Sequence, residues 1–450
     1  MTPMNYTHLQ QTDPEIYSLL QKEEKRQKEG LELIPSENYA SSAVIQAVGS
    51  IFIDKYSEGY PKKRYYGGNN NIDGVETLAQ ERMKALFHVP HANVQPYSGS
   101  PANLAVYFAL CKPGDAIMGQ KLQEGGHMTH GLKVSMTGKY FKSCQYSVLP
   151  SGAIDFDEVE RIAMEVKPVV IWCGATAYVK KFDYKRFAEI ADKCGAYLAA
   201  DIAHVAGLII GGVHPSPVPY AHIVTTTTHK TLRGPRGGSI MVTARGLEKD
   251  PELAKKIDRA VFPGLQGGPH NHTTAGIAVA LHEASTKEFV TYTRQIVTNA
   301  AVLADKLKKE GFTLVGDGTE NHLLLVDLRP LNINGWYMEK ALEEVNITVN
   351  KNTVPKDTNA PFYPSGIRLG TPAITSRGMD EKDMATVAKF IGRVKDAIKR
   401  YSYVAEKMTK DDVKERKQFA TDIQKDAVLL KMKNEIKAFA EKFPVPGLDI

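Results

Sequence analysis

Lys230 stands out by the chemistry of its neighbours. It follows four threonines and a histidine, Thr225–His229, and precedes a glycine-rich turn that ends at Gly238. Hydroxyl groups and a histidine around one lysine make little sense in an apolar core, but they suit a covalently held carbonyl compound that carries a phosphate. A lysine in an apolar or cationic environment loses its proton more readily and can form a Schiff base. From spacing alone, an ordinary solvated lysine is the alternative.

Asp201 lies upstream of this lysine, at the end of the apolar segment 196–200. A carboxylate at the carboxyl end of a buried strand is unfavourable unless it has a partner. The protonated nitrogen of a pyridine cofactor is such a partner. A helix N-cap is the alternative for an isolated aspartate, but the combination of Asp201 with Lys230 favours the cofactor.

Two glycine-containing segments suit the same ligand. Tyr97–Asn103 places serines and a glycine at the start of a predicted helix, where free backbone N–H groups bind anions such as phosphate. In Glu124–Gly131, the glycines allow the backbone to approach a ligand, and His127 offers a flat ring. A structural histidine is the alternative for His127 taken alone.

The elements around these residues alternate between short apolar strands and helices. This alternation predicts an α/β fold with a mostly parallel sheet flanked by helices, whose ligand lies beyond the carboxyl ends of the strands. The predicted strands of this part are 116–118, 169–172, 196–200, 223–225 and 239–242, and the predicted helices include 75–87, 102–110 and 184–193.

After about residue 288 the pattern changes to that of a smaller α+β domain. A long helix is expected from Glu288, and Asp13–Pro14 and Gly30 mark the ends of a first helix. We therefore expect an N-terminal helical arm over 1–30, a large domain over 31–285 and a small C-terminal domain over 286–450. Its predicted strands are 323–326, 347–349 and 367–369, followed by helices over 382–401 and 410–442.

The composition is that of an ordinary globular protein. Among 450 residues the net charge is only +6, and no long basic run indicates a nucleic-acid partner. The four cysteines form no CxxC pair, as expected for reduced thiols. No apolar stretch reaches the roughly 20 residues that span a bilayer, and the start of the chain has no apolar core typical of a signal peptide. We expect a cytoplasmic protein with no membrane partner and no metal.

The chain resembles serine hydroxymethyltransferase, a pyridoxal-5′-phosphate (PLP) enzyme of fold type I, along essentially its whole length. The motifs that carry the resemblance are Leu33–Tyr39, Asp54–Pro61, Lys63–Gly68 and above all 211–238. The resemblance implies reversible conversion of L-serine and tetrahydrofolate to glycine and 5,10-methylenetetrahydrofolate. It also implies a homodimer or a dimer of dimers.

The resemblance assigns roles to individual residues. Lys230 would carry PLP as an internal aldimine, Asp201 would pair with the pyridine nitrogen, and His127 would stack on the ring. Catalytic roles are implied for Lys230, Glu58, His127, Asp201, His204 and His229, with Glu58 as the acid/base near the hydroxymethyl group. Cofactor contacts are implied for Ser98, Gly99, Ser100, His127, Thr176, Asp201, His204, Thr227, Lys230, Gly267 and Gly268, the last two reaching the neighbouring subunit.

Substrate and folate contacts follow in the same way. The planar guanidinium of Arg368 would bind the substrate carboxylate, a task that suits its fork geometry. The amino-acid site would consist of Ser36, Tyr56, Glu58, Tyr65, Tyr66 and Arg368. The folate site would consist of Leu122, Gly126, His127, Met128, Ala360, Pro361 and Phe362.

Several positions depart from the family's usual residues. An acidic residue and an aromatic are usual where Asn69–Asn71 stand, and Ala360 replaces a serine that helps to bind folate. Tyr97 and Glu124 replace common histidines, and Thr176 replaces a serine. Because none of these changes removes a PLP-binding group, PLP use is expected. Two alternatives stay open: a folate-independent PLP aldolase or transaldolase on 3-hydroxy amino acids, and a catalytically silent relative that binds RNA or a partner protein.

Replacing Lys230 with alanine should abolish covalent attachment of PLP and turnover, because no second lysine lies nearby in the sequence. Borohydride reduction followed by mass spectrometry measures the attachment. Normal turnover in Lys230→Ala would contradict the assignment.

Overall fold

The computed structural model describes residues 6–449. Residues 1–5, on which the expectation of no signal peptide partly rests, lie outside them, as does residue 450. The chain divides into two compact units, Ala43–Arg294 and Met1–Ser42 together with Gln295–Ile450. These limits differ from the predicted boundaries after residues 30 and 285. Residues 31–42 belong with the C-terminal segment because β1 (Leu31–Glu32) pairs in parallel with β13 (Ile347–Thr348).

A seven-stranded sheet forms the centre of the unit Ala43–Arg294. Its strand order is β4-β10-β9-β8-β7-β5-β6, and the five strands from β9 to β6 pair in parallel, while β10 is antiparallel to both β4 and β9. The predicted fold class is thereby confirmed. The strands are β4 (His91–Asn93), β5 (Ala116–Gln120), β6 (Lys142–Tyr146), β7 (Val170–Cys173), β8 (Tyr197–Asp201), β9 (Ile223–Thr227) and β10 (Gly238–Val242). Of the seven strands, β4, which is short, and β6, which is largely polar, were not predicted.

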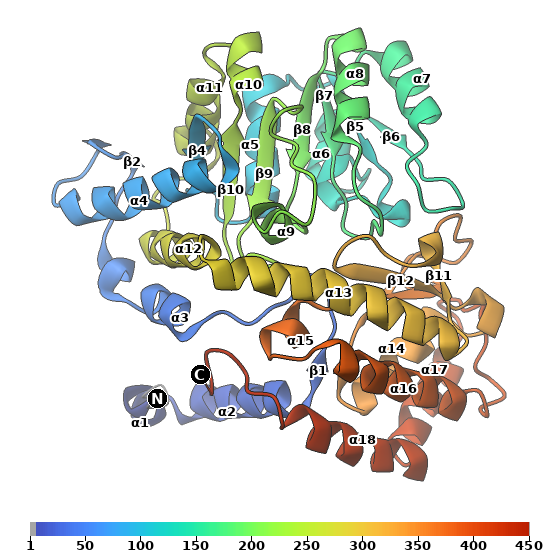
Figure 1. The fold of residues 1–450 in the computed structure, drawn as a ribbon. Coiled ribbons are helices and arrows are strands. Elements are labelled where there is room, and N and C mark those ends of the chain that lie inside the picture. Colours follow the sequence, from blue (N-terminus) through green and yellow to red (C-terminus); the bar gives the residue numbers. More distant parts are fainter. Residues whose placement is uncertain (1–5, 450) are drawn as a thin grey trace. The chain divides into compact units, whose positions relative to one another are not determined.

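Helices cover both faces of this sheet, with α8 (Tyr184–Cys194) in front and α5 (Gly99–Leu110) behind in Figure 1. Because side chains alternate along a strand, Val170 and Trp172 pack into the core beneath α5. The other helices and helical turns of this unit are α3 (Ser42–Val48), η1 (Ile51–Asp54), α4 (Asn70–Phe87), η2 (Leu122–Glu124), η3 (Met128–His130), α6 (Met136–Tyr140), α7 (Phe156–Val166), α9 (Ala206–Ile210), α10 (Ala244–Lys249), α11 (Leu253–Arg259), η4 (Ala260–Leu265) and α12 (Asn271–Ala284), and a hairpin joins β2 (Gly59–Tyr60) to β3 (Lys63–Arg64).

The other unit contains an antiparallel sheet of order β11-β12-β15-β14. Its strands are β11 (Thr313–Leu314), β12 (Leu323–Asp327), β14 (Asn350–Asn352) and β15 (Gly366–Gly370). Its helices and helical turns are α1 (Thr7–Thr12), α2 (Pro14–Glu29), η5 (Val315–Asp317), η6 (Arg329–Leu331), α14 (Gly335–Glu344), α15 (Pro372–Ser376), α16 (Glu381–Ile398), α17 (Val413–Ile423) and α18 (Ala427–Ala440), and α13 (Lys287–Lys309) runs across the limit between the units.

Local signals placed several helix ends correctly. The Asp13 carboxylate accepts a hydrogen bond from the Ile16 N–H at 3.0 Å, Pro14 is the first helical residue, and Gly30 follows α2. The region 410–442 differs from the single helix expected, because Asp426 caps a second helix there by accepting from the Val428 and Leu429 N–H groups.

Within residues 6–449, no helix combines the length and the apolar character needed to cross a membrane.

Arg377 joins the two ends of this unit's sequence. Its side chain is fully buried and donates to backbone carbonyls that follow α2 and end α18, including those of Gly30 at 2.7 Å, Ala440 at 2.5 Å and Phe443 at 2.8 Å. The last carbonyls of a helix have no partner within the helix. Arg377 therefore caps two helices at once and fixes α2 to α18.

Arg377→Met should lower the free energy of unfolding by on the order of 3 kcal/mol, because it leaves several buried carbonyls without a donor. Differential scanning calorimetry measures the change. Arg393→Met is the control, since Arg393 makes an exposed ion pair with Glu435 worth at most about 1 kcal/mol. Equal shifts in the two variants would contradict the proposed capping.

Candidate active site

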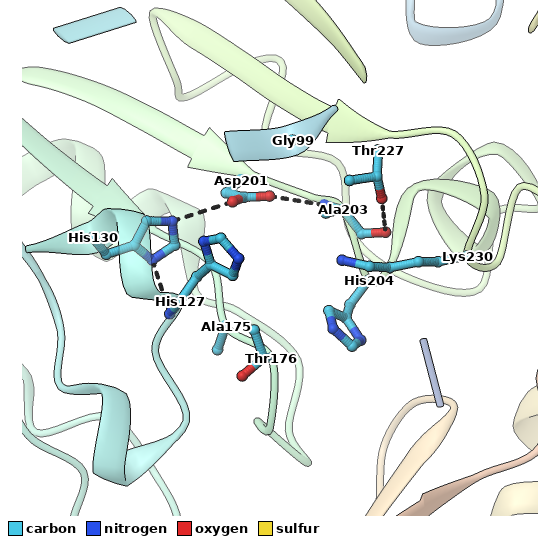
Figure 2. Close-up of a pocket in the computed structure, with 10 residues that line it drawn as sticks. All are labelled: Gly99, His127, His130, Ala175, Thr176, Asp201, Ala203, His204, Thr227 and Lys230. Carbon is cyan, nitrogen blue, oxygen red and sulfur yellow. Dashed lines mark hydrogen bonds and ion pairs between the residues drawn. The ribbon is translucent and has the colours of Figure 1, made fainter. Parts of the chain in front are cut away.

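A cavity lies where β8 and β9 end, within the unit Ala43–Arg294 (Figure 2). The side chains of Lys230 and His127 enter it from opposite sides. Its lining residues are Gly99, His127, His130, Ala175, Thr176, Asp201, Ala203, His204, Thr227 and Lys230. Only His130, Ala175 and Ala203 were not expected from the sequence. The structure thus brings together residues from five separate segments of the chain.

Asp201 is held in one orientation by three hydrogen bonds. Its Oδ2 accepts from Asn103 Nδ2 at 2.8 Å and from His130 Nε2 at 3.2 Å, and its Oδ1 accepts from the Ala203 N–H at 3.0 Å. Burial raises the pKa of this carboxyl group, but the hydrogen bond from His130 and the nearby positive charges outweigh burial and hold the pKa below its ordinary value. The cavity therefore presents a fixed carboxylate anion.

Asn103 and His130 are functional neighbours that the sequence did not reveal. Asn103 Nδ2 also donates to Thr129 Oγ1 at 2.9 Å, and Asn103 Oδ1 accepts from Thr225 Oγ1 at 2.7 Å. His130 stacks on Trp172 with ring centroids 5.2 Å apart. A signal was present for Asn103, which lies four residues after Gly99 and so on the same face of α5.

His127 is a neutral ring at physiological pH. Burial, followed by the charge of His130, lowers its pKa to about 4. Its Nδ1 lies 2.7 Å from Thr129 Oγ1, which fixes the ring. His127, His130 and Asp201 also have the proximity of a metal-ligand set, with ligand atoms within 4.8 Å, while His127 Nδ1 contacts Thr129 and His130 Nε2 contacts Asp201.

The N-terminus of α5 borders the cavity at Gly99. The helix begins at Gly99, with Ser98 as its N-cap, and its first N–H groups point out of the helix. A side chain at position 99 would place Cβ 2.7 Å from Thr227 Cγ2, so Thr227 would have to shift to accommodate it. Ser98 and Ser100 flank Gly99 there without being part of the cavity lining among the described residues.

The loop that carries Lys230 is fixed to the loop after β8. Thr227 Oγ1 donates to the Ala203 carbonyl at 3.4 Å, and Thr231 Oγ1 donates to the His204 carbonyl at 3.1 Å. Within residues 6–449, His229 is not among the residues that line the cavity. Burial, with Lys230 and Arg236 nearby, lowers the His229 pKa to about 3, so this ring is also neutral.

Comparison with known proteins matches the sequence to a family. The serine hydroxymethyltransferase family model matches residues 9–391. The chain is 52% identical over 443 residues to a serine hydroxymethyltransferase of Desulfotalea psychrophila, covering 98% of this chain and 97% of that protein. It is also 52% identical over 439 residues to a serine hydroxymethyltransferase of Acidothermus cellulolyticus, covering 97% of each chain.

The chain belongs to the serine hydroxymethyltransferase family. It is therefore a PLP-dependent glycine hydroxymethyltransferase, with tetrahydrofolate as co-substrate, in the one-carbon metabolism of serine and glycine. The cavity fits this cofactor. It combines a lysine, an anionic carboxylate and a neutral ring with a helix N-terminus that begins at a glycine.

A second group of expected site residues surrounds the β2–β3 hairpin in the same unit. A Cβ built at Gly267 would lie 3.3 Å from Glu58 Oε1, and one at Gly268 would lie 3.6 Å from the Tyr56 ring. The rings of Tyr56 and Tyr66 meet edge to face at 5.0 Å. Among the described residues, none of this group lines the Lys230 cavity.

Other residues that the sequence predicted to bind the amino acid or folate lie in the other unit. Arg368 is buried on β15, and its Nε donates to Asn350 Oδ1 at 3.0 Å. Burial lowers its pKa to about 10, so the guanidinium stays charged at neutral pH. Ser36 is half-buried in the segment after β1, and Ala360, Pro361 and Phe362 form an exposed loop before β15.

The folate residues expected in the unit Ala43–Arg294 lie in the loop from η2 to η3. Gly126 has no room for a side chain, since a Cβ there would lie 2.0 Å from the Gln120 carbonyl oxygen. Leu122 begins η2, and Met128, half of whose surface is exposed, begins η3 directly after His127.

His130→Phe should weaken PLP binding by on the order of 10-fold and make the binding fail at a higher pH than in the wild type. The phenyl ring retains the stacking on Trp172, but the loss of the hydrogen bond raises the pKa of Asp201. As the pH falls, the variant therefore loses its carboxylate first. Fluorescence titration of the apoenzyme with PLP at pH 7.5 and 5.5 measures this.

His282→Phe, an exposed position on α12, is the matched control. An identical pH profile for PLP binding in His130→Phe and the wild type would overturn the role given to His130.

Proposed function

We propose that Lys230, Asp201 and His127 hold PLP in the cavity and that serine loses its hydroxymethyl group there. The observation that carries the proposal is one lysine facing an anionic carboxylate in the same enclosed space. PLP, when bound, supplies an electron-withdrawing ring next to the bond that breaks. Asp201 would keep the proton on the ring nitrogen, and the uncharged His127 ring would stack without competing for it.

The phosphate would bind at the N-terminus of α5. The N–H groups of Gly99 and Ser100 and the positive end of the helix dipole suit a dianion. Ser98, Thr176, Thr227 and His204 would complete the contacts to the cofactor. Thr176 Oγ1 donates to the Gly125 carbonyl at 3.1 Å, so the cofactor loop and the folate loop would be linked.

Arg368 would bind the substrate carboxylate, with Ser36 and Tyr66 near the amino-acid group. A buried guanidinium favours an anionic partner, and a bidentate carboxylate gives it two short hydrogen bonds. Asn350 holds Nε and therefore fixes the plane of the fork.

Glu58 would exchange the proton of the serine hydroxyl group, a task that needs an ionisable side chain close to the reacting oxygen. The hairpin that carries Glu58 would act in the site of a second copy of the chain. Its neighbourhood has the exposed apolar surface of an interface, since Tyr65, 74% exposed, contacts Phe262 at 5.7 Å, and Phe108, 57% exposed, lies beside Gly264. This arrangement would require a homodimer. The protein would act in the cytoplasm.

Folate would lie along Leu122, Gly126 and Met128 and along the loop 360–362. Ala360 lacks the hydroxyl group that the family's serine offers, which is worth about 0.5–1.5 kcal/mol, or roughly a factor of 2 to 13 in affinity. Because the other contacts remain, tetrahydrofolate should still accelerate serine cleavage, with a raised half-saturation concentration.

A hybrid dimer tests the assignment of Lys230 and Glu58 together. Lys230→Ala and Glu58→Gln chains, co-expressed with different affinity tags and purified as the mixed dimer, should recover about half of the wild-type tetrahydrofolate-dependent activity, because one of two sites then has both native residues.

Lys230→Ala alone should be inactive and Glu58→Gln alone should keep only a small but measurable fraction of the wild-type rate, and mixed dimers of two Lys230→Ala chains with different tags serve as the control. An inactive hybrid would show that Lys230 and Glu58 of one site come from the same chain. Serine cleavage by the wild type that ignores tetrahydrofolate would instead favour the aldolase alternative.

A further inference from the structure

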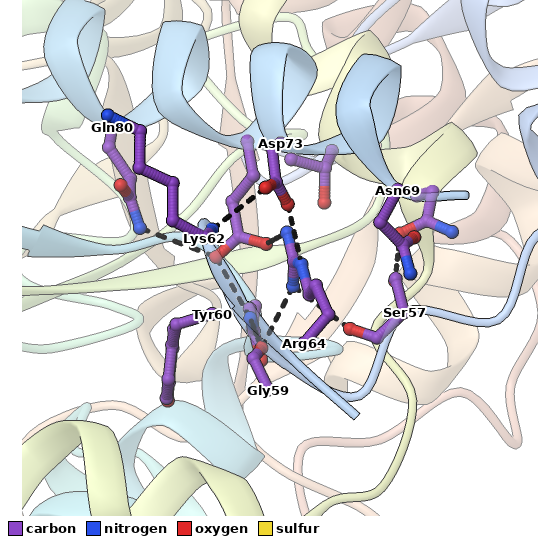
Figure 3. Close-up of polar contacts among 12 residues, drawn as sticks. Ser57, Gly59, Tyr60, Lys62, Arg64, Asn69, Asp73 and Gln80 are labelled. Carbon is purple, nitrogen blue, oxygen red and sulfur yellow. Dashed lines mark hydrogen bonds and ion pairs between the residues drawn. The ribbon is translucent and has the colours of Figure 1, made fainter. Parts of the chain in front are cut away.

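Arg64 holds the backbone on both sides of Glu58 (Figure 3). Its Nη1 donates to the Ser57 carbonyl at 2.9 Å and to the Gly59 carbonyl at 2.8 Å, and its side chain is 3% exposed. The carbonyl of Glu58 itself accepts from the Tyr65 N–H at 3.0 Å. Three consecutive carbonyls, centred on the proposed acid/base residue, are therefore fixed.

The rest of the guanidinium is anchored to α4. Arg64 Nε donates to Asp73 Oδ1 at 2.8 Å, and Nη2 donates to Glu76 Oε2 at 2.7 Å. Asp73 and Glu76 lie three residues apart and hence on one face of the helix. Asp73 Oδ2 also accepts from the Lys62 N–H at 2.8 Å, which ties the hairpin turn to the same helix.

Gln95 reinforces this anchor. Its Nε2 lies 2.9 Å from the Gly59 carbonyl and 2.9 Å from Glu76 Oε1, so it joins the hairpin to the buried carboxylate. Gly59 has φ +96°, and a Cβ there would lie 2.3 Å from the Lys63 carbonyl oxygen. The turn next to Glu58 thus has one tight conformation, which the network around Arg64 maintains.

We infer that Arg64 is a positioning residue for Glu58, acting from α4 through the Ser57 and Gly59 carbonyls. This inference rests on the proposed role of Glu58. A planar fork with several donors can span two carboxylates and two carbonyls, whereas an ammonium group cannot reach all four. Catalytic groups lose efficiency steeply when displaced, by about 100-fold for a shift on the order of 1 Å.

Arg64→Lys in the holoenzyme tests the inference. It should lower the tetrahydrofolate-dependent kcat by about 10-fold or more, with little change in PLP content or in the KM for serine. Hydrogen-exchange mass spectrometry should show faster exchange across residues 57–65. An unchanged kcat would overturn the inference.

The same substitution in a Glu58→Gln background separates positioning from general stability. If Arg64 acts through Glu58, Arg64→Lys should cause no further loss of kcat in that background. A loss of equal size in both backgrounds would overturn the inference while leaving the role of Glu58 intact. Full tetrahydrofolate-dependent activity in Glu58→Gln alone would overturn the role of Glu58 and, with it, the inference.

Arg377→Lys is the control for a general loss of stability. It also removes a buried guanidinium that donates to backbone carbonyls, so it should lower the melting temperature without the selective loss of kcat. Asp73→Asn is the milder variant should Arg64→Lys fold poorly. It weakens one anchor of Arg64 at a partly exposed position and should reduce kcat several-fold, again only when Glu58 is present. An unchanged kcat in Asp73→Asn would count against the inference.

Discussion

The ionised state of Asp201 is the constraint on which the rest of the cavity depends. A carboxylate this deeply buried would by itself tend to be protonated, because burial disfavours charge. The hydrogen bond from His130 on η3 and the positive charges of nearby groups reverse that tendency. Asn103 from α5 and the Ala203 N–H from the turn after β8 hold the same carboxylate in place, so the site of the anion forms where these segments meet. The parallel sheet, whose strands deliver their carboxyl ends to one edge, makes that meeting possible.

The cavity and the β2–β3 hairpin use different physical devices to fix their functional groups. In the cavity, packing and hydrogen bonds around β8, β9 and α5 leave little freedom to Lys230 and Asp201. The hairpin is only two residues long on each side and carries exposed aromatic rings, so sheet pairing alone holds it weakly. The buried guanidinium of Arg64 supplies the missing rigidity by joining the hairpin to α4.

Several residues that differ from the family's usual pattern have a structural account. Tyr97 donates its hydroxyl to the Gly268 carbonyl at 2.8 Å and stacks on His270 at 4.1 Å, so it holds the glycine loop in place. Asn69 Nδ2 donates to the Tyr66 carbonyl at 2.9 Å, which steadies the end of the hairpin segment. Glu124 accepts from the Val148 N–H at 2.7 Å. Tyr97, Asn69 and Glu124 are thus integrated in the fold, whereas Ala360 lacks the polar group of the residue it replaces.

The sequence by itself determined the cofactor lysine's surroundings, most strands of the large sheet, the presence of α5 after the segment that begins at Tyr97, and the ends of α2, because these depend on local propensity and on hydrophobic period. It also placed seven of the residues that line the cavity, through motifs that are contiguous in the chain. Only the tertiary structure decided that Asn103 and His130 hold Asp201, that Arg64 grips the backbone around Glu58, and that residues 31–42 belong with the C-terminal segment. Each of these depends on contacts between segments far apart in the sequence, and no local pattern encodes which distant partner a polar side chain will meet once the sheets have formed.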